Sequence, residues 1–182
     1  LMRSFSLSDN SIYSIYKDHE GGIWIGTMFG GVNYLPNRIL TFDKYVPGSD
    51  SHSLNTKRIR GLAEDNNGCI WIGTEDNGVN VLDPRTGKVH QIYDNVPGRL
   101  ITLSVKHYEN HIYVGLFKQG MNDISIPGEH LKYISDKELN IEEGSVYSFL
   151  KDSKGRTWIG PGWGLYVSQP KERKFHRVEE VG

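Results

Sequence analysis

The sequence contains only one cysteine, Cys69, which excludes both an internal disulfide bond and a cysteine-rich zinc site. Cys69 stands beside Ile70 and Trp71 in an apolar segment, where we expect an inert, buried thiol. Long hydrophobic runs are also missing. The longest uncharged apolar stretches, such as 69–73 and 79–82, are far shorter than the roughly 20 residues that a membrane-spanning helix needs. The first residues carry no signal-peptide pattern and begin as though cut from a longer chain.

An excess of charge of one sign is lacking as well. The 21 lysines and arginines nearly balance the 22 aspartates and glutamates, which leaves a formal net charge of -1. Binding to duplex nucleic acid depends on concentrated positive charge against the phosphates. The balance therefore argues against nucleic acid as a partner, and it offers no basic surface for a membrane.

Signatures of catalysis and of metal binding are absent from the sequence. No Gly-x-Ser-x-Gly elbow, phosphate-binding loop or kinase motif occurs. The seven histidines are scattered, and only His107 and His111 lie four residues apart. On a single strand this spacing would separate them by about 13 Å, which is too far to share a metal ion. We therefore expect no metal site, no cofactor and no enzymatic activity in this chain.

What the sequence does contain is an internal repeat. Residues 12–27 recur as 59–74 and again, in part, as 146–160, and a weaker copy surrounds 112–115. One position of the repeat is aromatic in all four copies, with spacings of 47, 42 and 45 residues between Trp24, Trp71, Tyr113 and Trp158. A period of about 40 to 50 residues is typical of β-propeller blades.

Each copy has the pattern of four short strands. In the first copy, residues 12–16 alternate, 23–25 form a β-rich run between glycines, and 32–35 and 39–42 complete a meander. No sustained helical stripe occurs, although residues 138–143 could hold one turn. The sequence thus predicts an all-β fold: a β-propeller segment of four four-stranded blades, at about 8–55, 56–100, 101–143 and 144–182.

Turn residues separate the expected strands. Asp18, Asp65 and Asp152 each precede a glycine by three residues, so that a short acceptor side chain can bond the turn backbone while glycine adopts positive φ. Calcium binding is the alternative for these loops, but each loop has few carboxylates. Two further sets of glycines, expected where the blades crowd together, are Gly26, Gly73, Gly115 and Gly160, and Gly31, Gly78, Gly120 and Gly164.

Aromatic residues fall into two groups. The tryptophans at the repeated strand position are expected to pack between blades. Trp163 breaks this pattern because it lies in the turn 160–164, and Phe29 and Phe117 occupy comparable places in the first and third copies. These three side chains either contact a ligand or a neighbouring domain, or cap the surface of the ring itself.

The repeat resembles a known family. The motif Asp-x-x-Gly-Gly-Ile-Trp-Ile-Gly-Thr-x-x-Gly-Gly-Val at 18–32 is similar to the two-component regulator propeller repeat, and 65–79 match it again almost position for position. Residues 152–165 match with Pro161 in place of the threonine and with one residue fewer before the following glycine. The third copy departs most, because Glu109-Asn110-His111 replaces the Asp-x-x-Gly turn.

Such repeats resemble those in the periplasmic sensor regions of Bacteroidetes hybrid two-component histidine kinases, usually in seven-bladed rings. Residues 7–34 are similar to the start of the second ring of such sensors. The resemblance implies a non-catalytic sensor segment in the periplasm, with the kinase elsewhere in the full-length protein. It also implies a role in signal transmission, with an oligosaccharide as the possible ligand and neighbouring blades and domains as partners.

Two other functions remain open at this point. One is a stand-alone four-bladed propeller that acts as an interaction scaffold. The other is a propeller glycosidase of the sialidase type, because residues 153–158 come within one residue of the Asp-box turn of those enzymes. Ser153 stands where that turn needs aspartate, which argues against the enzyme.

Propeller connectivity predicts where a ligand would bind. The loops after the Gly-Thr strand (28–29, 75–77, 117–119, 161–163) and the long loops between blades (47–55, 95–99) are expected to share one face. The residues expected to contact a ligand or a neighbouring domain on this face are Phe29, Glu75, Asp76, Phe117, Lys118 and Trp163.

The number of blades also has a consequence for association. Four blades are fewer than the seven of the resembling rings, so the two terminal blades are expected to expose apolar faces. We expect an open arc that self-associates in preference to a distorted four-bladed closure.

Overall fold

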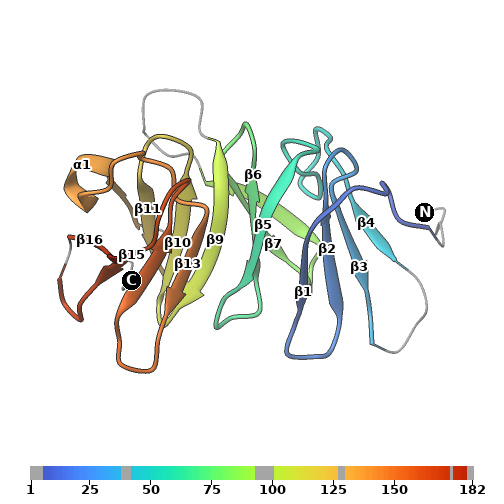
Figure 1. Ribbon diagram of the computed structural model, residues 1–182. Helices are drawn as coiled ribbons and strands as arrows, with labels where there is room; N and C mark the ends of the chain where they lie inside the picture. Colours follow the sequence, from blue (N-terminus) through green and yellow to red (C-terminus); the bar gives the residue numbers. More distant parts are fainter. Residues whose placement is uncertain (1–5, 38–41, 93–100, 127–129, 173, 180–182) are drawn as a thin grey trace.

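The computed structural model describes residues 6–37, 42–92, 101–126, 130–172 and 174–179. Within these residues, sixteen strands form four antiparallel sheets of four strands each. The strands of each sheet are paired in chain order, so every sheet is a meander, as the sequence predicted. Figure 1 shows the four sheets following one another in a curved row, with the first blade at one end and the fourth at the other.

The strand bounds lie within the four blade ranges expected from the repeat. Blade 1 contains β1 (Ile12–Lys17), β2 (Ile23–Thr27), β3 (Val32–Leu35) and β4 (Asp43–Tyr45). Blade 2 contains β5 (Ile59–Glu64), β6 (Ile70–Thr74), β7 (Val79–Asp83) and β8 (Lys88–Ile92). Blade 3 contains β9 (Thr102–Tyr108), β10 (His111–Leu116), β11 (Met121–Ser125) and β12 (His130–Ile134). Blade 4 contains β13 (Ser148–Lys151), β14 (Thr157–Gly160), β15 (Tyr166–Ser168) and β16 (His176–Arg177).

The strand expected at 39–42 falls mostly outside the described residues, because 39–41 are not among them. The fourth strand that the structure describes in blade 1 is β4, which begins at Asp43 and pairs with Val32, Asn33 and Tyr34 of β3. From β4, Tyr45 packs against the core, where its ring stacks on Trp24 with the ring centroids 6.0 Å apart.

The one helical turn of the described residues, α1 (Asp136–Leu139), begins earlier than the expected turn at 138–143. Ser135 caps it: its hydroxyl accepts from the Glu138 amide, and the Glu138 carboxylate accepts from the Ser135 amide, which is a capping box. This Ser-x-x-Glu signal was present in the sequence. No helix in the described part of the chain has the length and apolar character needed to cross a membrane.

Each aspartate turn anchors the aromatic residue of its own blade. In blade 2, one Asp65 carboxylate oxygen accepts the Asn67 and Cys69 amides at 2.8 and 3.0 Å, and the other accepts the Trp71 indole N–H at 2.8 Å. The glycine of this turn, Gly68, has φ of +79°, as the turn chemistry requires. The same arrangement recurs at Asp18 with Trp24 and at Asp152 with Trp158.

Blade 3 lacks this anchor for a physical reason. Its aromatic residue is Tyr113, which has no indole N–H to satisfy. The hairpin between Tyr108 and His111 is correspondingly reduced to two residues, with Glu109 in the left-handed region at φ of 58°. In blade 3, the aspartate carboxylate of the turn and the indole N–H that it would accept are therefore both absent.

The hydrophobic core lies between the blades. Trp24 and Val32 of blade 1 pack against Ile59, Leu62 and Ile72 of blade 2 in one buried cluster. A second cluster joins blades 2 and 3 around Trp71, and a third joins blades 3 and 4 around Phe149, with Tyr113 packed against it. This confirms that the repeated aromatic residues of the first three blades pack against the next blade.

Glycines permit the close approach of the blades near their first strands. A Cβ atom on Gly26 would lie 2.9 Å from Cγ2 of Ile59, and one on Gly115 would lie 2.1 Å from the carbonyl oxygen of Val146 in blade 4. A Cβ atom on Gly160 of blade 4 would instead be nearest to the Ser148 hydroxyl oxygen of the same blade. The tight inter-blade contact is therefore confirmed for Gly26, Gly73 and Gly115. For the second set of glycines it is wrong at Gly31 and Gly120, where a Cβ atom would be nearest to the fourth strand of the same blade.

The outward faces of the two terminal blades are apolar and exposed. On the first strand of each blade, one position faces the preceding blade: Leu62, Val105 and Phe149 are 8%, 2% and 5% exposed there, whereas the equivalent Ile15 of blade 1 is 69% exposed. Leu150 of blade 4, on the other outward face, is 59% exposed. The four blades thus form an open arc whose ends do not cover each other.

Candidate functional site

The loops expected to recognise a ligand lie along one edge of the arc. In Figure 1 the hairpins after β2 and β6 share the upper edge with the connections between the blades, whereas the aspartate turns lie along the lower edge. The expected loop at 95–99 lies outside the described residues. We call the edge formed by the remaining hairpins and inter-blade connections the loop face.

Threonine side chains hold the hairpins of the loop face. The Thr27 hydroxyl donates to the carbonyl of Gly31 and accepts from the Gly30 amide, at 2.9 and 3.0 Å. Thr74 makes the same pair of bonds with Gly78 and Asn77. The Gly-Thr ending of the repeat therefore determines the conformation of the loop that follows it.

In blades 1 and 2, a buried asparagine ties the loop that enters the blade to its third strand. Asn33, which is fully buried, accepts the Ser8 amide at 3.0 Å and donates to the Ser8 hydroxyl at 2.7 Å. Asn80 holds Asn55 in the same way, at 3.3 and 2.7 Å. Because Asn33 and Asn80 are buried and use both ends of their amides, these bonds fix the two entering loops against the third strands.

At the junction of blades 1 and 2, the loop face carries a cluster of two arginines, one carboxylate and two aromatic rings. Glu75 lies between the arginines: its Oε2 is 3.1 Å from Nη2 of Arg60, and its Oε1 is 3.8 Å from Nη1 of Arg58. The Arg58 guanidinium lies 5.7 Å from the ring centre of Phe29, and that of Arg60 lies 4.8 Å from Tyr13. We call these five residues the arginine cluster.

The arginine cluster is partly solvent-exposed and carries excess positive charge. The side chains of Arg58, Arg60 and Glu75 are 42%, 33% and 22% exposed, and Phe29 is 50% exposed. The backbone of Phe29 is fixed by a hydrogen bond, because its amide donates to the Asp9 carboxylate at 2.8 Å. Hydrogen bonds from the Ser11 and Phe29 amides hold the pKa of Asp9 below its usual value. Two guanidinium groups beside one carboxylate leave further N–H donors next to a half-exposed aromatic ring.

The remaining predicted site residues are not gathered into this cluster. Asp76 follows Glu75 and is partly buried. Phe117 and Lys118 lie at the junction of blades 3 and 4, where the Lys118 ammonium is 5.2 Å from the Phe117 ring centre and its amide donates to the Ser145 hydroxyl. Trp163 stands apart on blade 4 and is 77% exposed, so its ring does not cap the described surface.

Sequence analysis missed the two arginines and Tyr13. Arg58 and Arg60 stand just before and within β5, a segment that sequence analysis treated only as a copy of the repeat. The available signal was that an arginine at position 60 interrupts an otherwise apolar segment from Ile59 to Ala63. Their pairing with blade 1 aromatics depends on how two blades meet.

The histidine argument against a shared metal rested on a wrong geometry. His107 and His111 do not lie on one strand: they flank the two-residue hairpin, with His107 opposite Ile112 on the neighbouring strand. His107 Nε2 instead bonds the Glu109 carbonyl at 2.7 Å, and His111 Nδ1 bonds the Asp123 carboxylate at 2.6 Å. Among the residues that the structure describes, no three histidine, cysteine, aspartate or glutamate side chains form a metal-binding group.

Comparison with known proteins supports the repeat assignment. The family model of the two component regulator propeller matches residues 6–29 and 53–76, which begin before β1 and β5 and end just after the Gly-Thr strand. Both segments are thus similar to the two-component regulator propeller repeat. No match to a curated protein reaches significance.

Solved structures share the fold of this chain. The extracellular domain of the hybrid two-component system BT3049 of B. thetaiotaomicron is 23% identical, with a TM-score of 0.79 over 94% of this chain and 24% of that one. The corresponding domain of BT4673 is 24% identical, with a TM-score of 0.78 over 96% of this chain and 25% of that one. The chain thus spans about a quarter of the length of these extracellular domains.

The fold alone does not identify a function. Virginiamycin B lyase from Staphylococcus aureus also matches, with 12% identity and a TM-score of 0.74 over 94% of this chain and 56% of that one. The family model distinguishes these proteins at the level of sequence, because it matches two segments of the present chain.

Proposed function

We propose that the chain is a non-catalytic segment of the extracellular sensor region of a two-component system, located in the periplasm. In this proposal it contributes to the recognition of a carbohydrate on the loop face and to the transmission of that signal. A histidine kinase would be part of the same full-length protein. The regulator propeller repeats and the likeness to extracellular sensor domains support the assignment.

The observation that carries the ligand part of the proposal is the arginine cluster. Sugars present apolar C–H faces that pack on aromatic rings, and hydroxyl groups that accept hydrogen bonds from guanidinium groups. Phe29 and Arg58 offer both features side by side at an exposed position. Glu75 holds both arginines, so little side-chain freedom would be lost when a ligand binds.

The open arc favours a segment of a larger ring over a stand-alone four-bladed scaffold. A closed ring of four blades would bury the outward positions of blades 1 and 4, whereas Ile15 and Leu150 are 69% and 59% exposed. In this proposal, neighbouring blades of a longer sensor pack against these faces.

The proposal is tested by titrating the chain with a panel of neutral and acidic oligosaccharides, followed by calorimetry and by amide NMR shifts. We expect at least one oligosaccharide to shift amides of the loop face, and Phe29→Ala and Arg58→Gln to weaken its binding roughly tenfold or more. Lys154→Ala, on the opposite edge beside the Asp152 turn, is the matched control and should leave binding unchanged. Absence of binding, or shifts confined to the aspartate turns, would refute the carbohydrate assignment.

A further inference from the structure

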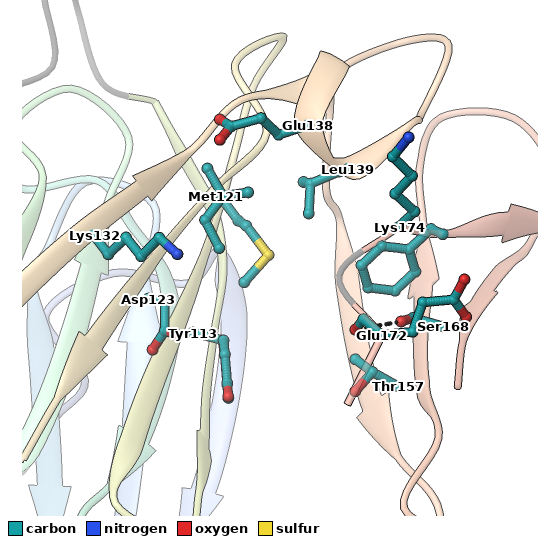
Figure 2. Close-up of a pocket in the computed structure, with 12 residues that line it drawn as sticks. Tyr113, Met121, Asp123, Lys132, Glu138, Leu139, Thr157, Ser168, Glu172 and Lys174 are labelled. Atoms are coloured by element: carbon teal, nitrogen blue, oxygen red, sulfur yellow. Dashed lines mark hydrogen bonds between the residues drawn. The ribbon is translucent and has the colours of Figure 1, made fainter. Parts of the chain in front are cut away.

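A cleft of about 450 Å³ lies between blades 3 and 4, at the side of the arc covered by α1. Its floor is apolar: Met121, Leu139 and Phe175 line it and are themselves at most 5% exposed. Figure 2 shows Met121 and Leu139 together with polar lining residues that come from both blades. The volume falls within the range of small-molecule sites in proteins.

The cleft exists because blade 3 departs from the repeat on the side that faces blade 4. The residue opposite the repeated aromatic is Tyr34 in blade 1, where its ring stacks on Trp24 at 4.3 Å, and Val81 in blade 2. Both side chains help to fill the junction with the next blade. Blade 3 has Asp123 at this position, opposite Tyr113.

Blade 4 departs from the repeat on the facing side. The positions that meet the preceding blade are the cross-strand pairs Ile70–Leu82 in blade 2 and Ile112–Ile124 in blade 3, all four fully buried. In blade 4 the equivalent pair is Thr157 and Ser168. An apolar junction has thus been replaced on both sides by hydroxyl and charged groups, and local departures from a consistent pattern are typical of functional sites.

The carboxylates that line the cleft are already bonded within the protein. Asp123 binds His111 Nδ1 at 2.6 Å, and Glu172 binds His176 Nε2 at 2.7 Å. Glu138 accepts the amide and hydroxyl of its own cap residue, each at 3.0 Å. These bonds give each carboxylate of the cleft a hydrogen-bond partner within the protein.

The lysines of the cleft have no such partners. Lys132 extends from β12 and Lys174 from the segment before β16, both exposed, and neither forms an ion pair with any residue in the described part of the chain. Burial and the Asp123 carboxylate raise the pKa of Tyr113 to about 12, so its hydroxyl stays a hydrogen-bond donor at neutral pH. The unsatisfied groups of the cleft are therefore cations and neutral donors above an apolar floor.

We propose that this cleft binds a small organic anion, with its apolar ring or chain on Met121, Leu139 and Phe175. Lys132 and Lys174 neutralise its carboxylate, sulfate or phosphate group, and the hydroxyl of Thr157 donates a hydrogen bond to it. Lysine is a common partner for such groups, because its ammonium acts as a mobile point charge with three donors. The site is separate from the arginine cluster, so it does not depend on carbohydrate binding to the loop face.

The test is an amide NMR titration of the chain with phenyl phosphate, phenyl sulfate and benzoate, and with phenyl β-D-glucopyranoside as the neutral compound that carries the same ring. We expect saturable shifts around Asp123, Lys132 and Phe175 for at least one anion, and binding of the neutral glucoside at least roughly tenfold weaker. The comparison among the three anions identifies the preferred charged group.

Two sets of variants make the site assignment specific. Lys132→Gln and Lys174→Gln should each weaken anion binding roughly tenfold, whereas Lys88→Gln on the fourth strand of blade 2 should leave it unchanged. Asp123→Tyr introduces the tyrosine that blade 1 has at this position. It should abolish anion binding by filling the cleft, and the denaturant midpoint of unfolding should stay the same. Phe29→Ala should not affect anion binding, which separates this site from the loop face.

Three results would overturn the proposal. They are no saturable binding of any of the three anions, equal affinity for the neutral glucoside, or unchanged anion affinity in a variant that carries both Lys132→Gln and Lys174→Gln. The lysine substitutions are on exposed side chains, so the folded chain remains available for measurement even where Asp123→Tyr does not fold.

Discussion

The Trp71 indole N–H donates to the Asp65 carboxylate at 2.8 Å, and this single bond connects the surface turn of a blade to its core. The Trp71 ring is 1% exposed and packs against blade 3, while the other oxygen of Asp65 closes the turn. A buried indole without an acceptor would lose a hydrogen bond that water cannot replace. The repeat therefore contains aspartate and tryptophan as one unit.

The first prediction concerns this pair. Asp65→Ala should lower the free energy of unfolding by about 3 kcal/mol, because it leaves the buried indole and two turn amides without their acceptor. In a Trp71→Phe background, which lacks the indole donor, the same substitution should cost clearly less. Urea denaturation of the four members of this double-mutant cycle measures the coupling. Equal losses in both backgrounds would show that Asp65 acts through the turn alone.

The second prediction contrasts two tryptophans. Trp71→Ala should cost about 3 to 5 kcal/mol, because it leaves a large cavity between blades 2 and 3. Trp163→Ala should cost less than about 1.5 kcal/mol, because its ring is 77% exposed. Denaturation midpoints of the two variants provide the comparison. A loss at Trp163 as large as that at Trp71 would mean that the exposed ring is buried in solution.

The third prediction concerns the ends of the arc. The outgoing face of blade 4 repeats the chemistry of the internal junctions, since Leu165 stands where Val32, Val79 and Met121 are buried, and it is 43% exposed. We expect the isolated chain to self-associate through these end faces, with a concentration-dependent mass in light scattering.

Substitutions on the end faces identify the contact. Ile15→Lys and Leu150→Lys should each shift the chain toward monomer, whereas Val46→Lys, at a residue that is 45% exposed beside β4, should not. A monomer at high concentration in the unsubstituted chain, with the end blades protected from hydrogen exchange, would favour a closed four-bladed scaffold instead.

The fourth prediction concerns pH. Hydrogen bonds from the Trp158 indole and then from Arg156 and the turn amides hold the pKa of Asp152 well below its usual value. Because the folded-state pKa is depressed, the stabilisation is fully present above the unfolded value of about 4 and is lost as the pH falls below it. Asp152→Asn should therefore show a smaller loss of stability than the unsubstituted chain between about pH 5 and about pH 3, measured by urea midpoints. Parallel pH profiles for the two proteins would contradict the assignment.

The sequence by itself determined the architecture of each blade. The spacing of the aromatic positions, the alternation in residues 12–16 and the Asp-x-x-Gly turns predicted four meanders, because strands and turns depend on residues close together in the chain. Positive φ at Gly68 follows from the same local chemistry. The strand at 43–45 was not predicted, because Asp43 and Lys44 give no local β signal and their pairing with β3 decides the strand.

Only the tertiary structure decided which side chains meet at the junctions between blades. The arginine cluster joins Phe29 and Tyr13 of blade 1 to Arg58 and Glu75 of blade 2, and the cleft of blades 3 and 4 joins Lys132 to Lys174, 42 residues further along the chain. No local pattern records which face of a strand meets the next blade, or that an aspartate at position 123 leaves space there. Those contacts exist only when whole sheets pack, because packing brings side chains from distant repeats within bonding distance.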